Sequence, residues 1–255
     1  MENYLTKNKV ARANLFAKVR EELSPLINLL PPPEVLSVKD LLPLSSSQHR
    51  PLVNLISQDS LSASHAANNP LVLVFASARR AGGGVEGGSV AQEEDVSLNS
   101  SWALQAALAT SFYDPTKRSS ALNADLLLYI PKVLCLSDLS RTVAMVGIAA
   151  PNVRGLRDQG MVESRIKKEG NESARHRLAA LFELAHRQQH DEVIVGAWGC
   201  GVFAFPITDM VENFKWAIQN TAFAGKITFA LPVVPESSAW RSFSELLPPS
   251  KKHNL

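Results

Sequence analysis

The sequence predicts one three-layer α/β domain. The wholly apolar segment 71–75 and the largely apolar segments 142–149 and 193–195 are typical of strands buried on both faces of a sheet. Segments with helical spacing of apolar residues alternate with them, at 92–110 and 178–185. This alternation favours helices on both faces of one sheet. The 255 residues, 45% of them hydrophobic, are enough to build one large core.

The other elements are predicted in chain order. Residues 8–24 have an apolar stripe of Val10, Leu15, Val19 and Leu23 that predicts a helix, which Pro25 should help to end. We expect residues 1–69 to form a helical and loop extension packed on a core of residues 70–255. Further strands are expected at 126–130, 133–136 and 227–231, and a helix that Thr208 caps. The charged segment 153–177 should lie on the surface.

Composition excludes several classes of function. The 26 basic and 24 acidic residues give a formal charge of +2, so no global field attracts DNA or a membrane. Two cysteines, Cys135 and Cys200, make neither a disulfide framework nor a zinc site, and they favour a reducing, intracellular compartment. His186 and His190 lack a nearby third ligand, so we expect neither a metal nor a cofactor. Neither a signal peptide nor a membrane span is predicted.

A glycine-rich loop, Gly82–Gly88, follows the strand at 71–75 and precedes Gln92, Glu93 and Glu94. Glycines let a backbone approach a ligand closely, and their N–H groups can bind an anion. Loops at the carboxyl end of a sheet strand are common ligand sites in α/β folds. The alternative is a flexible surface turn before a helix with an acidic first turn.

A second loop, Gly196–Phe203, follows the strand at 193–195. Its glycines would permit an amide-lined turn around a phosphate, and Phe203 could stack on a sugar or base. The alternative is a strand-to-helix turn that places Trp198 and Phe203 in the core. We expect Cys200 to be a small buried residue rather than a nucleophile. Neither a P-loop nor a Rossmann fingerprint occurs.

The glycine triplet Gly82–Gly84, seven residues and then Gln92–Glu94 resemble the signature of poly(ADP-ribose) glycohydrolases. Phe75–Ala78, Tyr129 with Pro131, Ala150–Asn152 and Gly196–Phe203 occur in the same order in the bacterial and fungal-type branch of that family. The resemblance covers roughly residues 70–232. It implies a macrodomain-like sandwich with a mixed central sheet, and hydrolysis of ribose–ribose bonds in poly(ADP-ribose).

The resemblance also implies residue roles. Glu94 would be the catalytic acid/base, and Glu93 would hold the hydroxyls of the terminal ribose. The same sugar pocket would be lined by Gln92 and by the backbone of Gly82, Gly83 and Gly84. Ser77 occupies the position of a substrate-contacting Asn in the animal branch. The second loop would bind the diphosphate and the ribose through Ala197, Trp198, Gly199, Cys200, Gly201, Val202 and Phe203.

Helix geometry bears on the mechanism. Neighbouring side chains on a helix diverge by about 100°, so we expect Glu93 and Glu94 not to flank a bond together. One working carboxylate, Glu94, would then protonate the leaving oxygen and activate water. Four positions depart from the family pattern and put affinity in doubt: Val74, Ala81, Val85 and Lys132.

The expected partners are poly(ADP-ribose), ADP-ribose and ADP-ribosylated proteins, and no direct contact with nucleic acid is expected. We expect the protein to be a monomer. We also expect it to release ADP-ribose from the free end of the polymer. Two alternatives stay open. One is a macrodomain that binds ADP-ribose without catalysis, and the other is a hydrolase of single ADP-ribose units on proteins.

Overall fold

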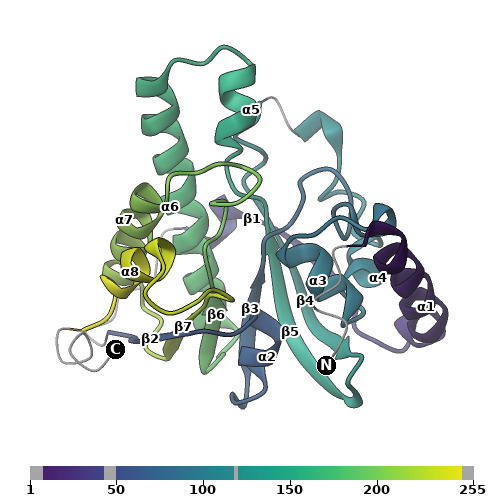
Figure 1. Cartoon of the computed structure of the whole chain (residues 1–255). Coiled ribbons are helices and arrows are strands. Elements are labelled where there is room, and N and C mark those ends of the chain that lie inside the picture. Colours follow the sequence, from purple (N-terminus) through teal and green to yellow (C-terminus); the bar gives the residue numbers. More distant parts are fainter. Residues whose placement is uncertain (1–7, 43–49, 118–119, 249–255) are drawn as a thin grey trace.

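A seven-stranded mixed sheet forms the centre of the computed structural model, which describes residues 8–42, 50–117 and 120–248 (Figure 1). The strand order is β1-β4-β5-β3-β6-β7-β2. Pairing is antiparallel from β1 to β5 and parallel from β5 to β2. The strands are β1 Glu34–Ser37, β2 Leu52–Ile56, β3 Pro70–Val74, β4 Leu126–Cys135, β5 Asp138–Ile148, β6 Glu192–Val195 and β7 Lys226–Ala230.

Helices cover both faces of the sheet, as alternating side chains of β3 show. Leu71 and Leu73 pack into the larger core cluster, with side chains of α6 and α7. Val72 and Val74 pack on the other face, against α3 and α4. The three-layer macrodomain-like fold is therefore confirmed. The helices are α1 Lys9–Ile27, α2 Ser60–Ser64, α3 Gln92–Leu98, α4 Trp102–Ala106, α5 Val153–Asp158, α6 Glu163–Arg187, α7 Ile207–Gln219 and α8 Ser238–Ser244.

The segment before residue 70 supplies both edge strands of the sheet. β1 pairs with β4 at one edge, and β2 pairs with β7 at the other. The division of the chain at residue 70 stays a prediction, but a cut there would leave β4 and β7 with exposed edges. None of the described helices combines the length and apolarity needed to cross a bilayer.

The first helix differs from its prediction in two ways. α1 continues past Pro25 and ends at Ile27. Its buried face contains Phe16, Val19 and Leu23, whereas Val10 is 69% exposed. The predicted stripe was wrong at its start because the helix does not pack on the sheet itself. It packs on α3, α4 and the short 3-10 turn Val85–Gly87.

Three other element predictions were wrong in detail. The helix expected at 92–110 is two helices, because Ser100 pairs with Cys135 and the Ser101 N–H donates to Leu134. The strands on either side of Pro131 are one strand, β4, with an irregularity between Ile130 and Val133. Thr208 lies inside α7, whose N-cap position is Pro206.

The charged segment 153–177 also differs from its prediction. It forms α5 and the first half of α6, and it is only partly on the surface. Arg177 is 1% exposed, because its guanidinium donates to backbone carbonyls of Leu122, Asn123 and Ala149.

Candidate active site

The two predicted loops both follow the carboxyl ends of central, parallel strands of the sheet. β3 and β6 are neighbouring parallel strands, so their carboxyl ends, Val74 and Val195, lie side by side. The glycine-rich loop leaves the first strand, and the loop Gly196–Phe203 leaves the second. This is the edge at which open α/β sheets bind ligands.

The turn Gly82–Gly84 is shaped by two acidic side chains. Gly82 and Gly83 have φ angles of +70° and +61°, a region that favours glycine. A Cβ on Gly83 would lie 2.6 Å from Oε1 of Glu94 and 3.0 Å from Oε2 of Glu93. The two carboxylates therefore converge on one glycine, and the expectation that they do not flank a bond together stays a prediction. Both side chains bend toward the loop because its N–H groups point at them.

Both oxygens of Glu93 accept hydrogen bonds. Oε2 accepts from the Ser77 N–H at 2.6 Å, and Oε1 accepts from the N–H of Gly82 at 3.1 Å and from Nε1 of Trp102 at 3.4 Å. Glu93 is 3% exposed, and this burial raises its pKa to about 8. The Ser77 N–H opposes the rise, and the nearby charge of Glu94 adds to it. Glu93 is thus a carboxyl group that holds a proton near neutral pH.

Glu94 has one oxygen in use and one available. Oε1 accepts from the Gly84 N–H at 2.8 Å. No described residue donates to Oε2. The residue is 7% exposed. Glu94 can therefore offer an oxygen to a ligand with less rearrangement than Glu93.

Gln92 joins the end of β3 to the start of α3. Its Oε1 accepts from the Phe75 N–H at 2.9 Å, and its Nε2 donates to Leu73 O at 3.0 Å and to Ser60 Oγ at 3.2 Å. Gln92 lines a groove at the carboxyl ends of the strands, and its role in a sugar pocket stays a prediction. Its amide is nevertheless fully engaged within the protein, so its first effect is to fix the two glutamates that follow it.

The second loop presents backbone N–H groups. Those of Gly199, Gly201, Val202 and Phe203 donate to no described group. Gly199 has a φ of +76°, and a Cβ there would lie 2.8 Å from Cβ of Ala150. Free N–H groups in a glycine turn form an anion-binding concavity. The loop therefore has the geometry expected for a diphosphate.

The side chains of this loop have separate roles. Trp198 is fully buried, and its Nε1 donates to Ile148 O at 2.9 Å, so its ring belongs to the core, as the alternative interpretation held. Burial raises the pKa of Cys200 to about 12, so its thiol stays protonated at neutral pH and is a poor nucleophile. Phe203 is partly buried and lines two cavities.

A groove of about 450 Å³ separates the loops. Phe75, Val90 and Ala91 line it on one side, and the loop from Ala197 to Phe203 lines the other. A smaller cavity of about 290 Å³ continues it through shared residues, among them Gln92 and Ala239. Glu93 and Glu94 are not among the lining residues of either, because their carboxylates are turned to Gly82–Gly84. Sequence reasoning missed Ala239, which comes from the short helix α8 and carries no motif.

Ser77 lies beyond Phe203. It lines a third cavity of about 610 Å³, together with Tyr113 and Asn152, and this cavity meets the groove at Phe203. The Ser77 backbone binds Glu93, so the predicted site residue is within reach of the carboxylate pair.

The four departures from the family pattern do not open the site. Val74 is fully buried in the apolar cluster over α3 and α4. Ala81 packs against the same cluster, and Val85 packs beneath α1. Lys132 is exposed, and its carbonyl accepts from Nε2 of Gln105. Val74 is therefore surrounded by apolar packing.

The fold and the site together define a macrodomain-like protein with two acidic residues beside an amide-rich loop. A sequence model described as the microbial-type PARG catalytic domain matches residues 44–138, which include Gly82–Glu94. The predicted resemblance to poly(ADP-ribose) glycohydrolases (PARG) of the microbial type is confirmed. None of the curated proteins matches the sequence.

Solved structures agree with the fold. Poly(ADP-ribose) glycohydrolase from Thermomonospora curvata, bound to the inhibitor ADP-HPD, has a TM-score of 0.80 at 22% identity, covering 93% of this chain and 99% of that chain. The enzyme from Deinococcus radiodurans in complex with ADP-ribose has a TM-score of 0.72 at 22% identity, covering 84% and 93%.

Proposed function

We propose that this protein is a poly(ADP-ribose) glycohydrolase, a glycosidase that hydrolyses ribose–ribose bonds and releases ADP-ribose from the free end of the polymer. One observation carries the proposal: the carboxylates of Glu93 and Glu94 converge on Gly83, and they directly follow Gln92, which lines a groove together with the loop that has free N–H groups. The T. curvata and D. radiodurans enzymes, whose structures hold ADP-HPD and ADP-ribose, support the ligand class.

Glu94 is the acid/base in this proposal. Its Oε2 accepts nothing from the described residues, so it can face the glycosidic oxygen. A proton passes from Glu94 to the departing ribose oxygen, and an oxocarbenium-like centre forms at the sugar carbon. The Glu94 carboxylate then takes a proton from the attacking water. Such catalysis contributes typically 10²–10⁴-fold, or about 3–5 kcal/mol.

Glu93 positions the ribose. Three N–H groups fix its carboxyl group, and its raised pKa keeps it neutral at pH 7. A neutral Glu93 adds no second negative charge beside Glu94 once Glu94 has given up its proton. It can also donate its proton to a ribose hydroxyl while its oxygens still accept.

The second loop holds the diphosphate. The N–H groups of Gly199, Gly201, Val202 and Phe203 have no acceptor within the part of the chain that the structure describes, and Phe203 borders the groove where a ribose would lie. A diphosphate fixed near the reacting sugar would stabilise the positive charge that develops on the sugar in the transition state.

The decisive experiment is incubation of the purified chain with poly(ADP-ribose), with free ADP-ribose measured by chromatography. We expect release by the wild type and a loss of about 10²–10⁴-fold in kcat in Glu94→Gln, with ADP-ribose affinity nearly unchanged. Glu86→Gln, an exposed carboxylate of the same loop, is the matched control and should keep full activity.

Two results would contradict the proposal. Binding of ADP-ribose without release would indicate a non-catalytic macrodomain. Release from a mono-ADP-ribosylated protein, with the polymer left intact, would indicate the other alternative. Near-normal turnover of Glu94→Gln would remove Glu94 from its role, even if the polymer is cleaved.

A further inference from the structure

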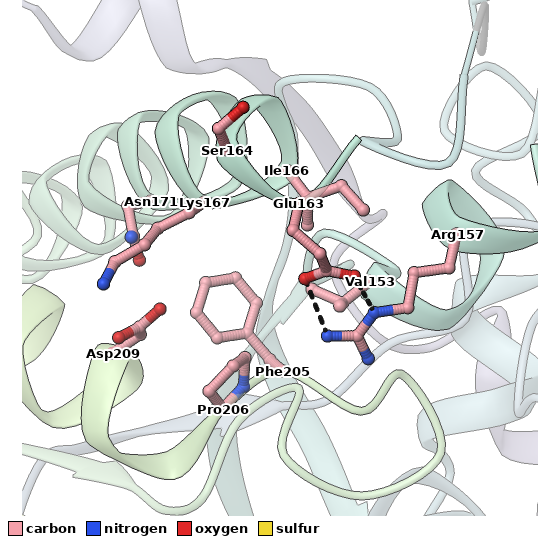
Figure 2. A pocket seen from close by; sticks show the side chains of 10 residues that line it. All are labelled: Val153, Arg157, Glu163, Ser164, Ile166, Lys167, Asn171, Phe205, Pro206 and Asp209. Carbon is pink, nitrogen blue, oxygen red and sulfur yellow. Dashed lines mark hydrogen bonds and ion pairs between the residues drawn. The ribbon is translucent and has the colours of Figure 1, made fainter. Parts of the chain in front are cut away.

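A second groove lies between α6 and α7, away from the two site loops. It has a volume of about 560 Å³ and is lined by Lys167, Lys168, Arg175, His176, Glu172 and Trp216, among others. A cavity of about 220 Å³ continues it toward α5, sharing Ser164, Lys167 and Asn171 (Figure 2). We call the two together the α6/α7 groove.

Three basic side chains of this groove, Lys167, Lys168 and Arg175, lack carboxylate partners. Arg157, which lines the smaller cavity, is paired with Glu163 (Figure 2). Elsewhere on α6, Arg165 pairs with Glu169 and Arg177 with Asp125. Among the described residues, no carboxylate lies within ion-pair distance of Lys167, Lys168 or Arg175. The acidic residues that line the groove include Glu172, Asp209 and Glu163, and Glu163 is already paired.

Arg175 is held in place without being neutralised. Its Nε donates to Oδ1 of Asn213 at 3.0 Å, and its guanidinium lies 5.9 Å from the ring centroid of Trp216. Asn213 is fully buried and donates in turn to Asn171 at 2.7 Å. No described residue accepts from the two terminal nitrogens of Arg175. A fixed guanidinium with free donors is suited to phosphate.

The α6/α7 groove adjoins the site through one short segment. The Phe205 N–H donates to Gly199 O at 3.0 Å, and Gly199 lines the catalytic groove. The Phe205 side chain, followed by Pro206, lies in the cavity of Figure 2, beside Lys167 and Asp209. The segment 199–206 therefore has one groove on each side.

We propose that the α6/α7 groove binds a diphosphate of the poly(ADP-ribose) chain that lies beyond the two units on either side of the bond being cleaved. This inference rests on the proposed function. A polymer of nucleotide units carries repeated negative charge and aromatic bases, and the groove offers unpaired cations beside Phe205 and Trp216. Arg175 binds the diphosphate, Lys167 and Lys168 attract it, and long polymers are thereby favoured over short ones.

The test compares Lys167→Ala/Lys168→Ala with the wild type on long polymer and on a substrate of two ADP-ribose units. Both lysines are exposed, so folding should be preserved. We expect KM for long polymer to rise about three- to tenfold, with kcat and the short-substrate KM unchanged. The slope of log KM against log salt should fall by about 1.4, because each neutralised contact to a single strand contributes about 0.7.

The matched control is Lys18→Ala/Lys39→Ala, which removes two exposed cations from other elements. The control should keep the wild-type KM on both substrates. An unchanged KM for long polymer in Lys167→Ala/Lys168→Ala would overturn the proposal, as would an equal rise on the short substrate or in the control.

A second measurement keeps this proposal separate from the proposed function. Anisotropy of labelled long polymer, in the Glu94→Gln background, reports binding even if no ADP-ribose is ever released. Loss of affinity on adding Arg175→Gln supports the groove. Competition by a single-stranded DNA oligonucleotide at equal nucleotide concentration would instead assign the groove to nucleic acid and overturn it.

Discussion

Gly83 shows how one residue without a side chain sets the geometry of two others. Its φ of +61° and the contact of both carboxylates leave no room for a Cβ. We expect Gly83→Ala to lower kcat at least 10²-fold and to reduce the free energy of unfolding by about 1–3 kcal/mol, because strain and a clash act together. Steady-state kinetics and urea denaturation measure both.

Gly87 offers the matched control in the same loop. A Cβ there meets nothing within 4 Å, and its φ is not in the left-handed region. Gly87→Ala should therefore be close to wild type in both measurements. Equal damage from the two substitutions would mean that the loop is merely sensitive to change, and that Gly83 has no special contact.

Glu93 makes stability depend on pH. Its folded-state pKa of about 8 exceeds the ordinary 4.5, so the folded chain binds a proton that the unfolded chain releases between those pH values. The contribution of Glu93 to the free energy of unfolding is present in full below pH 4.5. It is lost as pH rises to 8, by up to about 1.4 kcal/mol per pH unit.

The expected result is a difference in unfolding free energy between the wild type and the Glu93→Gln variant that changes with pH. The unfolding free energy of the wild type, minus that of Glu93→Gln, should fall as pH rises from 5 to 8. Urea denaturation at several pH values measures it. Glu21→Gln, an exposed carboxylate on α1, should show no such trend. A difference that is flat or rises with pH would show that Glu93 is ionised throughout.

At the scale of elements, α1 supports the catalytic loop from outside the sheet. Arg12 is 1% exposed, and it donates through Nη2 to Asp95 at 2.5 Å and through Nε to Ser89 O at 3.1 Å. The backbone of Lys9 contacts Gly88 so closely that no Cβ would fit there. One helix thus fixes both the end of the glycine-rich loop and the start of α3.

Arg12→Ala should therefore cost more than loss of a surface charge. We expect a reduction of about 2–4 kcal/mol in unfolding free energy, because the change leaves Asp95 and a backbone carbonyl without their partner. The exposed pair Arg20–Glu86, at 3.5 Å, is the control, and Arg20→Ala should cost under about 1 kcal/mol. Similar losses in both variants would show that α1 contributes only helix packing.

Strands and helices were predictable from the sequence where the local pattern of apolar residues is clear. β3, β6 and β7 are short, mainly apolar strands, and their positions were confirmed within about one residue. The helix 92–110 was wrong because its apolar spacing continues through Ser100 and Ser101, and only pairing with β4 interrupts it there. The edge strands β1 and β2 carry weak patterns, since each borders a single neighbour.

For the whole molecule, a net charge of +2 gives phosphate no long-range attraction. Binding of ADP-ribose should depend on the uncharged N–H groups of Gly199–Phe203. We expect the slope of log Kd against log salt to be below about 1 for ADP-ribose, as calorimetry between 50 and 200 mM salt can measure. A steep slope for this small ligand would indicate that cations bind it, contrary to the proposal.

The sequence by itself determined the strands at the centre of the sheet, the two glycine loops and the resemblance to the family signature, because these are local patterns of apolar and glycine residues. Only the tertiary structure decided that Glu93 and Glu94 turn to the same glycine, that α1 supports their loop, and that Arg175 has no carboxylate partner. Each of these depends on contacts between segments far apart in the chain, such as Arg12 with Asp95 and Arg175 with Asn213, which local spacing does not encode.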